Sequence, residues 1–155
     1  MPDHKPRITV EQFCGLWPPD MPFMQFYRFA VEQIGYGDAR VRLGYDEHHI
    51  RPGGSLSGPT IMTLADYTIW AVVLGMTGPD YRNAATSSLT VHFLRPAPAG
   101  DLIAEGRIIR LGRRLAVGEA AVYADGETGG ADPVAHVTAT YALPSARESA
   151  DSGSI

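Results

Sequence analysis

The sequence predicts a single α+β domain in which an antiparallel sheet packs against one long apolar helix. Two observations predict it. Residues 60–76 form an almost wholly apolar helical run, and several β-prone runs follow it with no helix between them. A chain of 155 residues is also long enough to bury one core without disulfides. We expect the domain to span residues 8–143, with disordered ends at 1–7 and 144–155.

Three elements are expected before the long helix. Thr9 with Gln12 three residues later is a capping-box pattern, which predicts a short helix. Two β-prone runs follow at residues 29–36 and 39–45. Gly and Asp at positions 37–38 predict that a hairpin turn joins these two strands.

The long helix is expected to begin after a turn-rich loop at residues 51–59. Pro59 suits the first position of a helix, where its missing N–H costs nothing, and Gly78 followed by Pro79 marks the end. Further extended runs then predict the remaining strands. They span residues 85–94, 102–111, 115–123 and 133–143.

Asp66 stands midway along this apolar helix. A buried ionised carboxylate without partners costs on the order of several kcal/mol, so it must be paired, hydrogen-bonded, protonated or used in chemistry. From this argument alone, a structural aspartate that bonds a neighbouring strand or a subunit contact is as reasonable as a functional one.

Gly58 marks a second point of interest at the start of the same helix. Unpaired N–H groups and the helix dipole there favour developing negative charge, as in an oxyanion hole. A helix rises about 1.5 Å per residue, so Gly58 and Asp66 lie roughly 12 Å apart along the axis. If both serve one reaction, they must come from different subunits across a two-fold axis, which predicts an obligate dimer.

Several blocks of sequence, in order and spacing, resemble a known family over roughly residues 29–143. The blocks are Ser57-Gly58-Pro59 with Leu64-Ala65-Asp66, Phe93-Leu94-Arg95-Pro96-Ala97, Ala99-Gly100-Asp101 and Gly112-Arg113-Arg114-Leu115. The chain is similar to the hotdog-fold acyl-CoA thioesterases of the phenylacetate-degradation (PaaI-like) type. The resemblance implies a hotdog fold, an antiparallel sheet wrapped around one central helix, and a homo-oligomer, either a dimer or a dimer of dimers.

The resemblance also implies an activity, the hydrolysis of an acyl-CoA thioester to free acid and CoA. It matches Asp66 to the family's general base or nucleophile and Gly58 to the backbone N–H that polarises the carbonyl. Thr86 matches a hydroxyl that orients the attacking water, with an ordinary strand threonine as the alternative. The alternative function is a non-catalytic protein that binds acyl-CoA or a small lipid.

Two positions differ from the family's usual pattern, because Ser57 and Arg51 stand where it has His and Asn. Ser57 is expected to cap the helix or to donate to a substrate carbonyl. Arg51 is expected to stabilise an oxyanion, to bind a phosphate or a carboxylate, or to pair with Asp66 across the interface. Arg113 and Arg114, at an expected hairpin, either meet the phosphates of CoA or lie in a solvated turn.

The overall composition argues against several other classes of protein. A net charge of −4 and a pI near 5.7 disfavour nucleic acid and anionic membranes as partners. The apolar helix is too short to span a bilayer and carries Asp66, so no membrane is expected. No metal-ligand spacing occurs, so neither a metal nor a cofactor is expected. The polar N-terminus lacks a secretory signal, which predicts a cytoplasmic protein.

The remaining notable residues are interpreted as structural. Cys14 is expected to be a packed thiol, and His48 and His49 are expected to be solvated loop residues. His92 and His136 are expected to be satisfied strand histidines. Aromatic and methionine residues of the long helix belong to the core or line an acyl tunnel. They are Met62, Trp70 and Met76.

Overall fold

The computed structural model describes residues 4–127 and 132–145. Most of the two ends predicted to be disordered, residues 1–3 and 146–155, lies outside the described residues. Arg7 already donates its backbone N–H to the carbonyl of Gly75 at 2.8 Å. The chain is therefore tied to the fold one residue before the predicted start of the domain.

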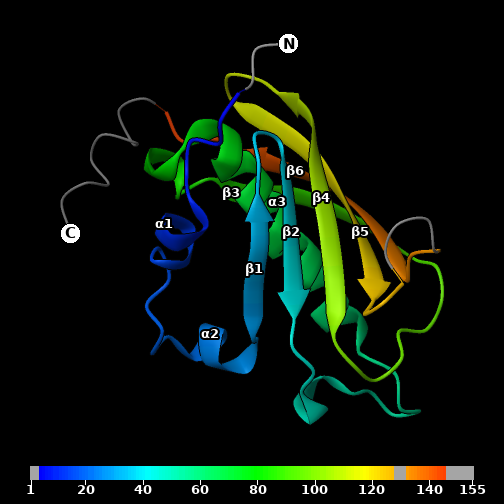
Figure 1. Ribbon diagram of the computed structural model, residues 1–155. Helices are drawn as coiled ribbons and strands as arrows, with labels where there is room; N and C mark the ends of the chain where they lie inside the picture. Colours follow the sequence, from blue (N-terminus) through cyan, green and yellow to red (C-terminus); the bar gives the residue numbers. More distant parts are fainter. Residues whose placement is uncertain (1–3, 128–131, 146–155) are drawn as a thin grey trace.

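Six antiparallel strands form one sheet in the order β1-β2-β4-β5-β6-β3 (Figure 1). The strands are β1 Phe29–Ile34, β2 Asp38–Leu43, β3 Ala85–Phe93, β4 Leu102–Leu111, β5 Leu115–Ala124 and β6 Ala135–Ala142. Each predicted strand is present, and the predicted α+β class is confirmed. Within the chain β3 pairs only with β6, so it forms an edge of the sheet.

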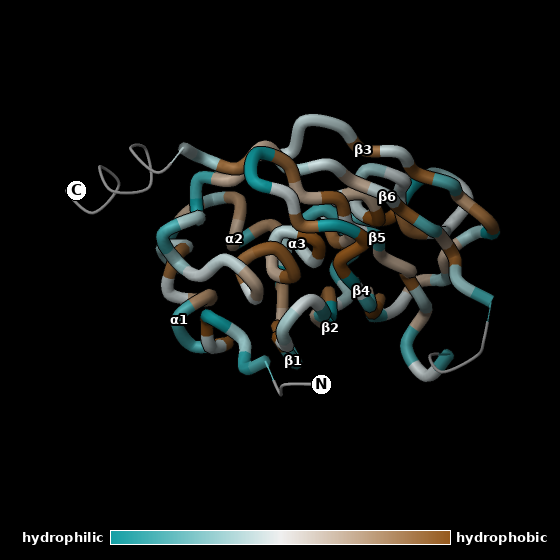
Figure 2. Tube along the Cα trace, turned by 90° about the horizontal axis from the view of Figure 1, so that it is seen from above, coloured by the Kyte–Doolittle hydropathy of each residue, from teal (hydrophilic) through white to brown (hydrophobic). Residues whose placement is uncertain are grey.

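The long helix, α3, spans Gly58–Thr77 and lies inside the curl of the sheet (Figure 1). Seen from above, the sheet passes around α3 from β1 through β4 to β3 (Figure 2). By length and composition alone α3 could cross a membrane, but 72% of its most apolar window is buried inside the fold. It is the core helix that the sequence predicts.

Small residues let the sheet approach α3 closely. A Cβ atom at Gly106 of β4 would meet methyl carbons of Thr68 and Val72 at 3.0 Å. A Cβ atom at Gly75 of α3 would collide with the carbonyl oxygen of Gly35. Because interiors are close-packed, larger residues at either position would push the helix away from the sheet.

Two short helices, α1 Val10–Cys14 and α2 Pro22–Phe26, lie on the side of α3 that the sheet leaves open (Figure 2). The predicted capping box of α1 is present. Helix α2 was not predicted, because a single turn of five residues is too short to show a helical period. Cys14 is exposed, so the packed-thiol prediction is wrong; its neighbour Phe13 is the residue that α1 buries.

Two 3₁₀ turns, Glu47–His49 and Pro79–Tyr81, complete the fold. The first of them corrects a prediction, because His49 is only 1% exposed rather than solvated. Its Nε2 lies 2.8 Å from the carbonyl oxygen of Phe26, and its ring stacks on Tyr27. His48 is largely exposed, as expected. One of these adjacent histidines is buried and the other exposed because a 3₁₀ turn points neighbouring side chains in different directions.

Candidate active site

Asp66 is half-buried, and hydroxyl groups from two strands hold one of its carboxylate oxygens. Thr86 of β3 donates to Oδ1 at 2.8 Å, and Tyr141 of β6 donates to the same atom at 2.5 Å. The Tyr141 hydroxyl also lies 2.8 Å from the backbone carbonyl of Asp66. Among the described residues, Oδ2 has no hydrogen-bond partner, and neither oxygen forms an ion pair. The carboxylate therefore keeps one oxygen free.

A β-bulge in β3 brings Thr86 into the site. Between Thr86 and Ser88 the pairing with β6 shifts, so that Ser87 has no partner of its own. Side chains along a strand alternate between faces, and one extra residue inverts that alternation. Leu89 faces the helix beyond the bulge, and Thr86 faces the helix before it, opposite Tyr141.

Tyr141 is the site residue that sequence reasoning missed. It is 3% exposed, and burial, together with the charge of Asp66, raises the pKa of its phenol far above the usual range. The phenol therefore stays protonated and donates at any physiological pH. One signal was available: a tyrosine stands on the apolar face of an alternating strand, where its hydroxyl needs a partner. The sequence did not show that this partner is Asp66.

A cavity of about 340 Å³ opens onto Asp66 and its two hydroxyl donors. Aromatic rings form much of its wall, and Arg82 also lines it. The rings are those of Trp17, Phe23, Tyr67 and Trp70. Of the three helix residues considered for an acyl tunnel, Trp70 lines this cavity, whereas Met62 and Met76 do not. The N-terminal segment and α3 thus build the wall together.

A second cavity, of about 370 Å³, lies at the N-terminus of α3 and contains Gly58 and Arg51. Ser57 caps the helix, its Oγ accepting from the N–H of Thr60 at 3.4 Å, as expected. A Cβ atom at Gly58 would lie 3.2 Å from the ring of Phe93, so glycine gives that ring room. Arg51 is exposed, and its side chain has no partner among the described residues.

The predicted site residues therefore fall into three places in one chain. Asp66 and Thr86 are in direct contact, whereas Gly58 with Ser57 and Arg51 belongs to the second cavity. Arg113 lines a smaller cavity at the opposite end of α3. Arg113 and Arg114 are both exposed there, at the β4–β5 hairpin. Within one chain Arg51 does not pair with Asp66.

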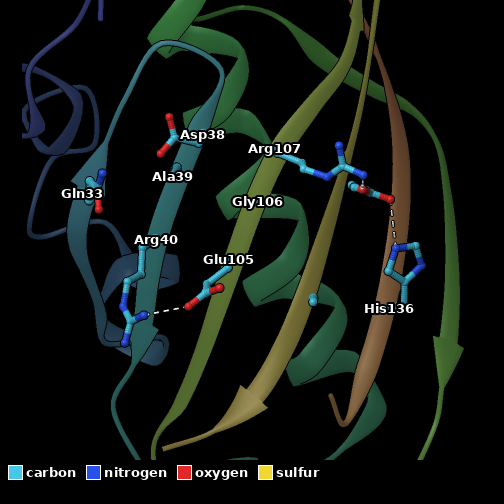
Figure 3. Close-up of a pocket in the computed structure, with 10 residues that line it drawn as sticks. Gln33, Asp38, Ala39, Arg40, Glu105, Gly106, Arg107 and His136 are labelled. Atoms are coloured by element: carbon cyan, nitrogen blue, oxygen red, sulfur yellow. Dashed lines mark hydrogen bonds and ion pairs between the residues drawn. The ribbon is translucent and has the colours of Figure 1, made fainter. Parts of the chain in front are cut away.

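A larger hollow, of about 480 Å³, lies on the outer face of the sheet, away from α3 (Figure 3). Most of its charged side chains pair with one another. Arg40 pairs with Glu105 at 2.7 Å, and Glu119 pairs with Arg107 and, at 3.0 Å, with His136. Asp38 is the one charged residue of this lining without an ion pair among the described residues, and it is exposed on the surface. We therefore place the candidate site at Asp66.

A sheet curled around one apolar helix is the hotdog fold, and here that helix carries a half-buried carboxylate. The comparison with known proteins identifies the class as the hotdog-fold thioesterases. The chain belongs to the thioesterase superfamily, which it matches over residues 53–131, and within it to the PaaI-like proteins. The predicted family and fold are thus confirmed.

Three related proteins illustrate the match. A candidate esterase of Halobacterium salinarum is 34% identical over 118 residues, which are 74% of this chain and 78% of that protein. The structure of a candidate thioesterase from a Silicibacter species is 31% identical with a TM-score of 0.77, covering 93% of this chain and 97% of that one. The phenylacetic acid degradation protein PaaI of Thermus thermophilus, in a mutant form, is 26% identical with a TM-score of 0.66, covering 78% and 97%.

Proposed function

We propose that this protein hydrolyses acyl-CoA thioesters, with Asp66 as the group that activates water. The observation that carries the proposal is the free Oδ2 of a carboxylate held by hydroxyl groups rather than by a cation. A carboxylate with one fixed and one free oxygen is suited to accept a proton. Membership of the thioesterase superfamily supports a thioester as the substrate.

The reaction follows from these groups. Oδ2 of Asp66 takes a proton from water while the water oxygen attacks the thioester carbonyl carbon. The N–H of Gly58 donates to the oxygen on which negative charge develops. The C–S bond then breaks, the CoA thiolate takes the proton back from Asp66, and the acid loses its remaining proton to solvent. Thr86 serves this scheme by fixing Asp66, and nucleophilic attack by Asp66 itself is the alternative route.

The proposed active site lies between two subunits. Gly58 and Asp66 face separate cavities of one chain, roughly 12 Å apart along α3. The exposed edge of β3, beside Thr86, is the expected contact with a second copy. A two-fold axis at this edge would bring Gly58 of one subunit toward Asp66 of the other.

Arg51 is the proposed contact for the charged part of CoA. It is an exposed cation without a side-chain partner among the described residues, beside the N–H groups that begin α3. Arg95 of the same cavity is already held by Glu127 and the carbonyl of Asp132. A protein from Streptococcus mutans bound to acetyl-CoA, 22% identical with a TM-score of 0.67, supports CoA binding at the level of the fold.

Thiol release from a panel of short, long and aromatic acyl-CoAs tests the proposed activity. Wild type is compared with Asp66→Ala and with the matched control Asp80→Ala, which removes an exposed carboxylate near the C-terminal end of α3. Gel filtration checks that all three remain assembled. We expect turnover to be lost only in Asp66→Ala. Binding of acyl-CoA without turnover by wild type would instead establish the non-catalytic binding protein.

A mixing experiment tests the shared active site. Gly58→Pro removes the backbone N–H at a position where a helix tolerates proline, and Gly58→Ala is the control that adds carbon but keeps the N–H. Gly58→Pro and Asp66→Ala should each be inactive. After random mixing, half the dimers are mixed and each holds one intact site, so about a quarter of wild-type activity should return. No recovery would place both groups in one subunit.

We also propose that the protein works in the cytoplasm. Cys14 is exposed and free, as is usual where thiols stay reduced. Cell fractionation with an antibody to the protein tests this location.

A further inference from the structure

We infer that Tyr141 is a positioning residue of the proposed hydrolysis, which selects Oδ2 of Asp66 as the oxygen that accepts the proton. This inference rests on the proposed function, but it concerns a residue to which neither the family resemblance nor the sequence assigned a role. It follows from three features: the contacts of Tyr141, its register in the sheet, and the other groups around Asp66.

Tyr141 fixes residue 66 at two points. Its hydroxyl lies within hydrogen-bonding distance of the side-chain Oδ1 and of the main-chain carbonyl of Asp66. A group that contacts both atoms restricts rotation of the side chain about its Cα–Cβ and Cβ–Cγ bonds. Because Thr86 also donates to Oδ1, both donors act on one oxygen and leave the other to face a substrate.

The register of the sheet places Tyr141 where its hydroxyl can hold the carboxylate of Asp66. Tyr141 pairs with Thr86 of β3 and with Ala116 of β5, so two neighbouring strands hold it. The bulge at Ser87 turns Thr86 toward the same side. The carboxylate on α3 is therefore held by the sheet, and the free edge of β3 lies next to it.

Few other titratable side chains line the cavity around Asp66. Tyr67 of α3 and Arg82 of the segment before β3 line the same cavity, and β3 contributes only the hydroxyl of Thr86. The N-terminal segment contributes Trp17 and Phe23, which carry no charge. Loss of the Tyr141 hydroxyl should therefore act on the carboxylate directly, because the hydroxyl stabilises its charged form.

The test compares Tyr141→Phe with the control Tyr123→Phe, which removes the hydroxyl of a half-buried strand tyrosine in β5 that does not line the cavity of Asp66. In Tyr141→Phe we expect kcat to fall roughly tenfold with KM nearly unchanged, and the acidic limb of the kcat profile to move to higher pH by roughly one unit. Tyr123→Phe should keep the wild-type profile. A wild-type profile in Tyr141→Phe would overturn the inference.

A second variant keeps the test valid if Tyr141→Phe folds poorly. Thr86→Val removes the other donor to Oδ1 and should shift the acidic limb in the same direction. If Thr86→Val leaves the limb unmoved, two donors do not hold the carboxylate, and the inference fails.

A measurement without turnover separates this inference from the proposed function. Proton NMR should show a slowly exchanging, downfield tyrosine hydroxyl signal that disappears in both Tyr141→Phe and Asp66→Ala. The persistence of that signal in Asp66→Ala would disprove the contact even in an active enzyme. Failure of wild type to hydrolyse any thioester would sink the proposed reaction and, with it, the catalytic part of the inference.

Discussion

The two sides of the sheet hold their carboxylates in opposite ways. On the outer face, Glu105 is paired with Arg40 (Figure 3), and Glu119 is paired with Arg107. On the helix side, Asp66 has hydroxyl donors and no ion pair among the described residues. A fixed cation neutralises a carboxylate, whereas hydroxyl groups orient it and leave its charge in place. The paired acids of the outer face are therefore structural, whereas the charge of Asp66 is left available for chemistry.

The largest effect should come from neutralising one acid on each side. Asp66→Asn keeps the size of the side chain but removes the proton acceptor, so kcat should fall by about 10²- to 10⁴-fold. Glu119→Gln on the outer face should change kcat less than about twofold, because it leaves Asp66 and its donors intact. Both variants are assayed by thiol release at equal subunit concentration. An equal loss of kcat in both variants would contradict the view that only the helix-side carboxylate takes part in the reaction.

A cation placed beside Asp66 should neutralise its carboxylate in the way that the arginines neutralise the carboxylates of the outer face. Thr63 lines the same cavity one helical turn before Asp66, within reach of an i, i+3 pair. Thr63→Lys should lower kcat about two- to fivefold by pairing with the carboxylate. Added salt should restore part of the loss, because salt screens the pair. Thr63→Met, of similar length but uncharged, is the control, and salt should have no such effect on it.

A smaller effect is expected from the outer face itself. Arg42 contacts three carboxylates, those of Glu32, Asp101 and Asp125. Arg42→Met should lower the free energy of unfolding by about 1 kcal/mol, since exposed ion pairs are weak, and should leave kcat unchanged. Urea denaturation at low and high salt measures this. A loss that does not shrink at high salt would mean that packing of the arginine stem matters more than its charge.

The smallest effect concerns Asp46, a carboxylate held mainly by a backbone N–H. The N–H of His48, followed by the side chains of His48 and Arg28, lowers the pKa of Asp46 below its usual range. A depressed pKa stabilises the folded state above the unfolded-state pKa and loses that contribution as pH falls through the folded-state value. The Tm difference between wild type and Asp46→Asn should therefore be steady from about pH 7 to 5 and narrow below about pH 4. A difference that stayed constant in still stronger acid would contradict this.

Much of the fold could be predicted from local sequence, and much of the site could not. The apolar run of α3, its cap at Ser57 and the strand runs all depend on neighbouring residues, and each was predicted. Asp66 stood out because a carboxylate is rare among apolar helix residues. Tyr141 did not, because its role depends on β6 lying between β5 and β3 and on the bulge at Ser87. Neither long-range pairing nor a bulge leaves a local pattern.

The predictions of burial that were wrong, for Cys14 and His49, also failed because burial depends on long-range packing. Cys14 and Phe13 are adjacent, and which of them is buried depends on how the single turn of α1 meets the core. His49 is buried because α2, which carries no helical period, supplies the carbonyl of Phe26. Short elements take their orientation from what they pack against, so the sequence around them does not determine burial.

The separation of Gly58 from Asp66 along α3 has a consequence for how the activity depends on concentration. On the proposed arrangement a lone subunit holds two incomplete half-sites and hydrolyses nothing. Specific activity would then rise with protein concentration through the range of the dimer dissociation constant. Newly made or dissociated chains would leave the cell's thioesters intact until they met a second copy.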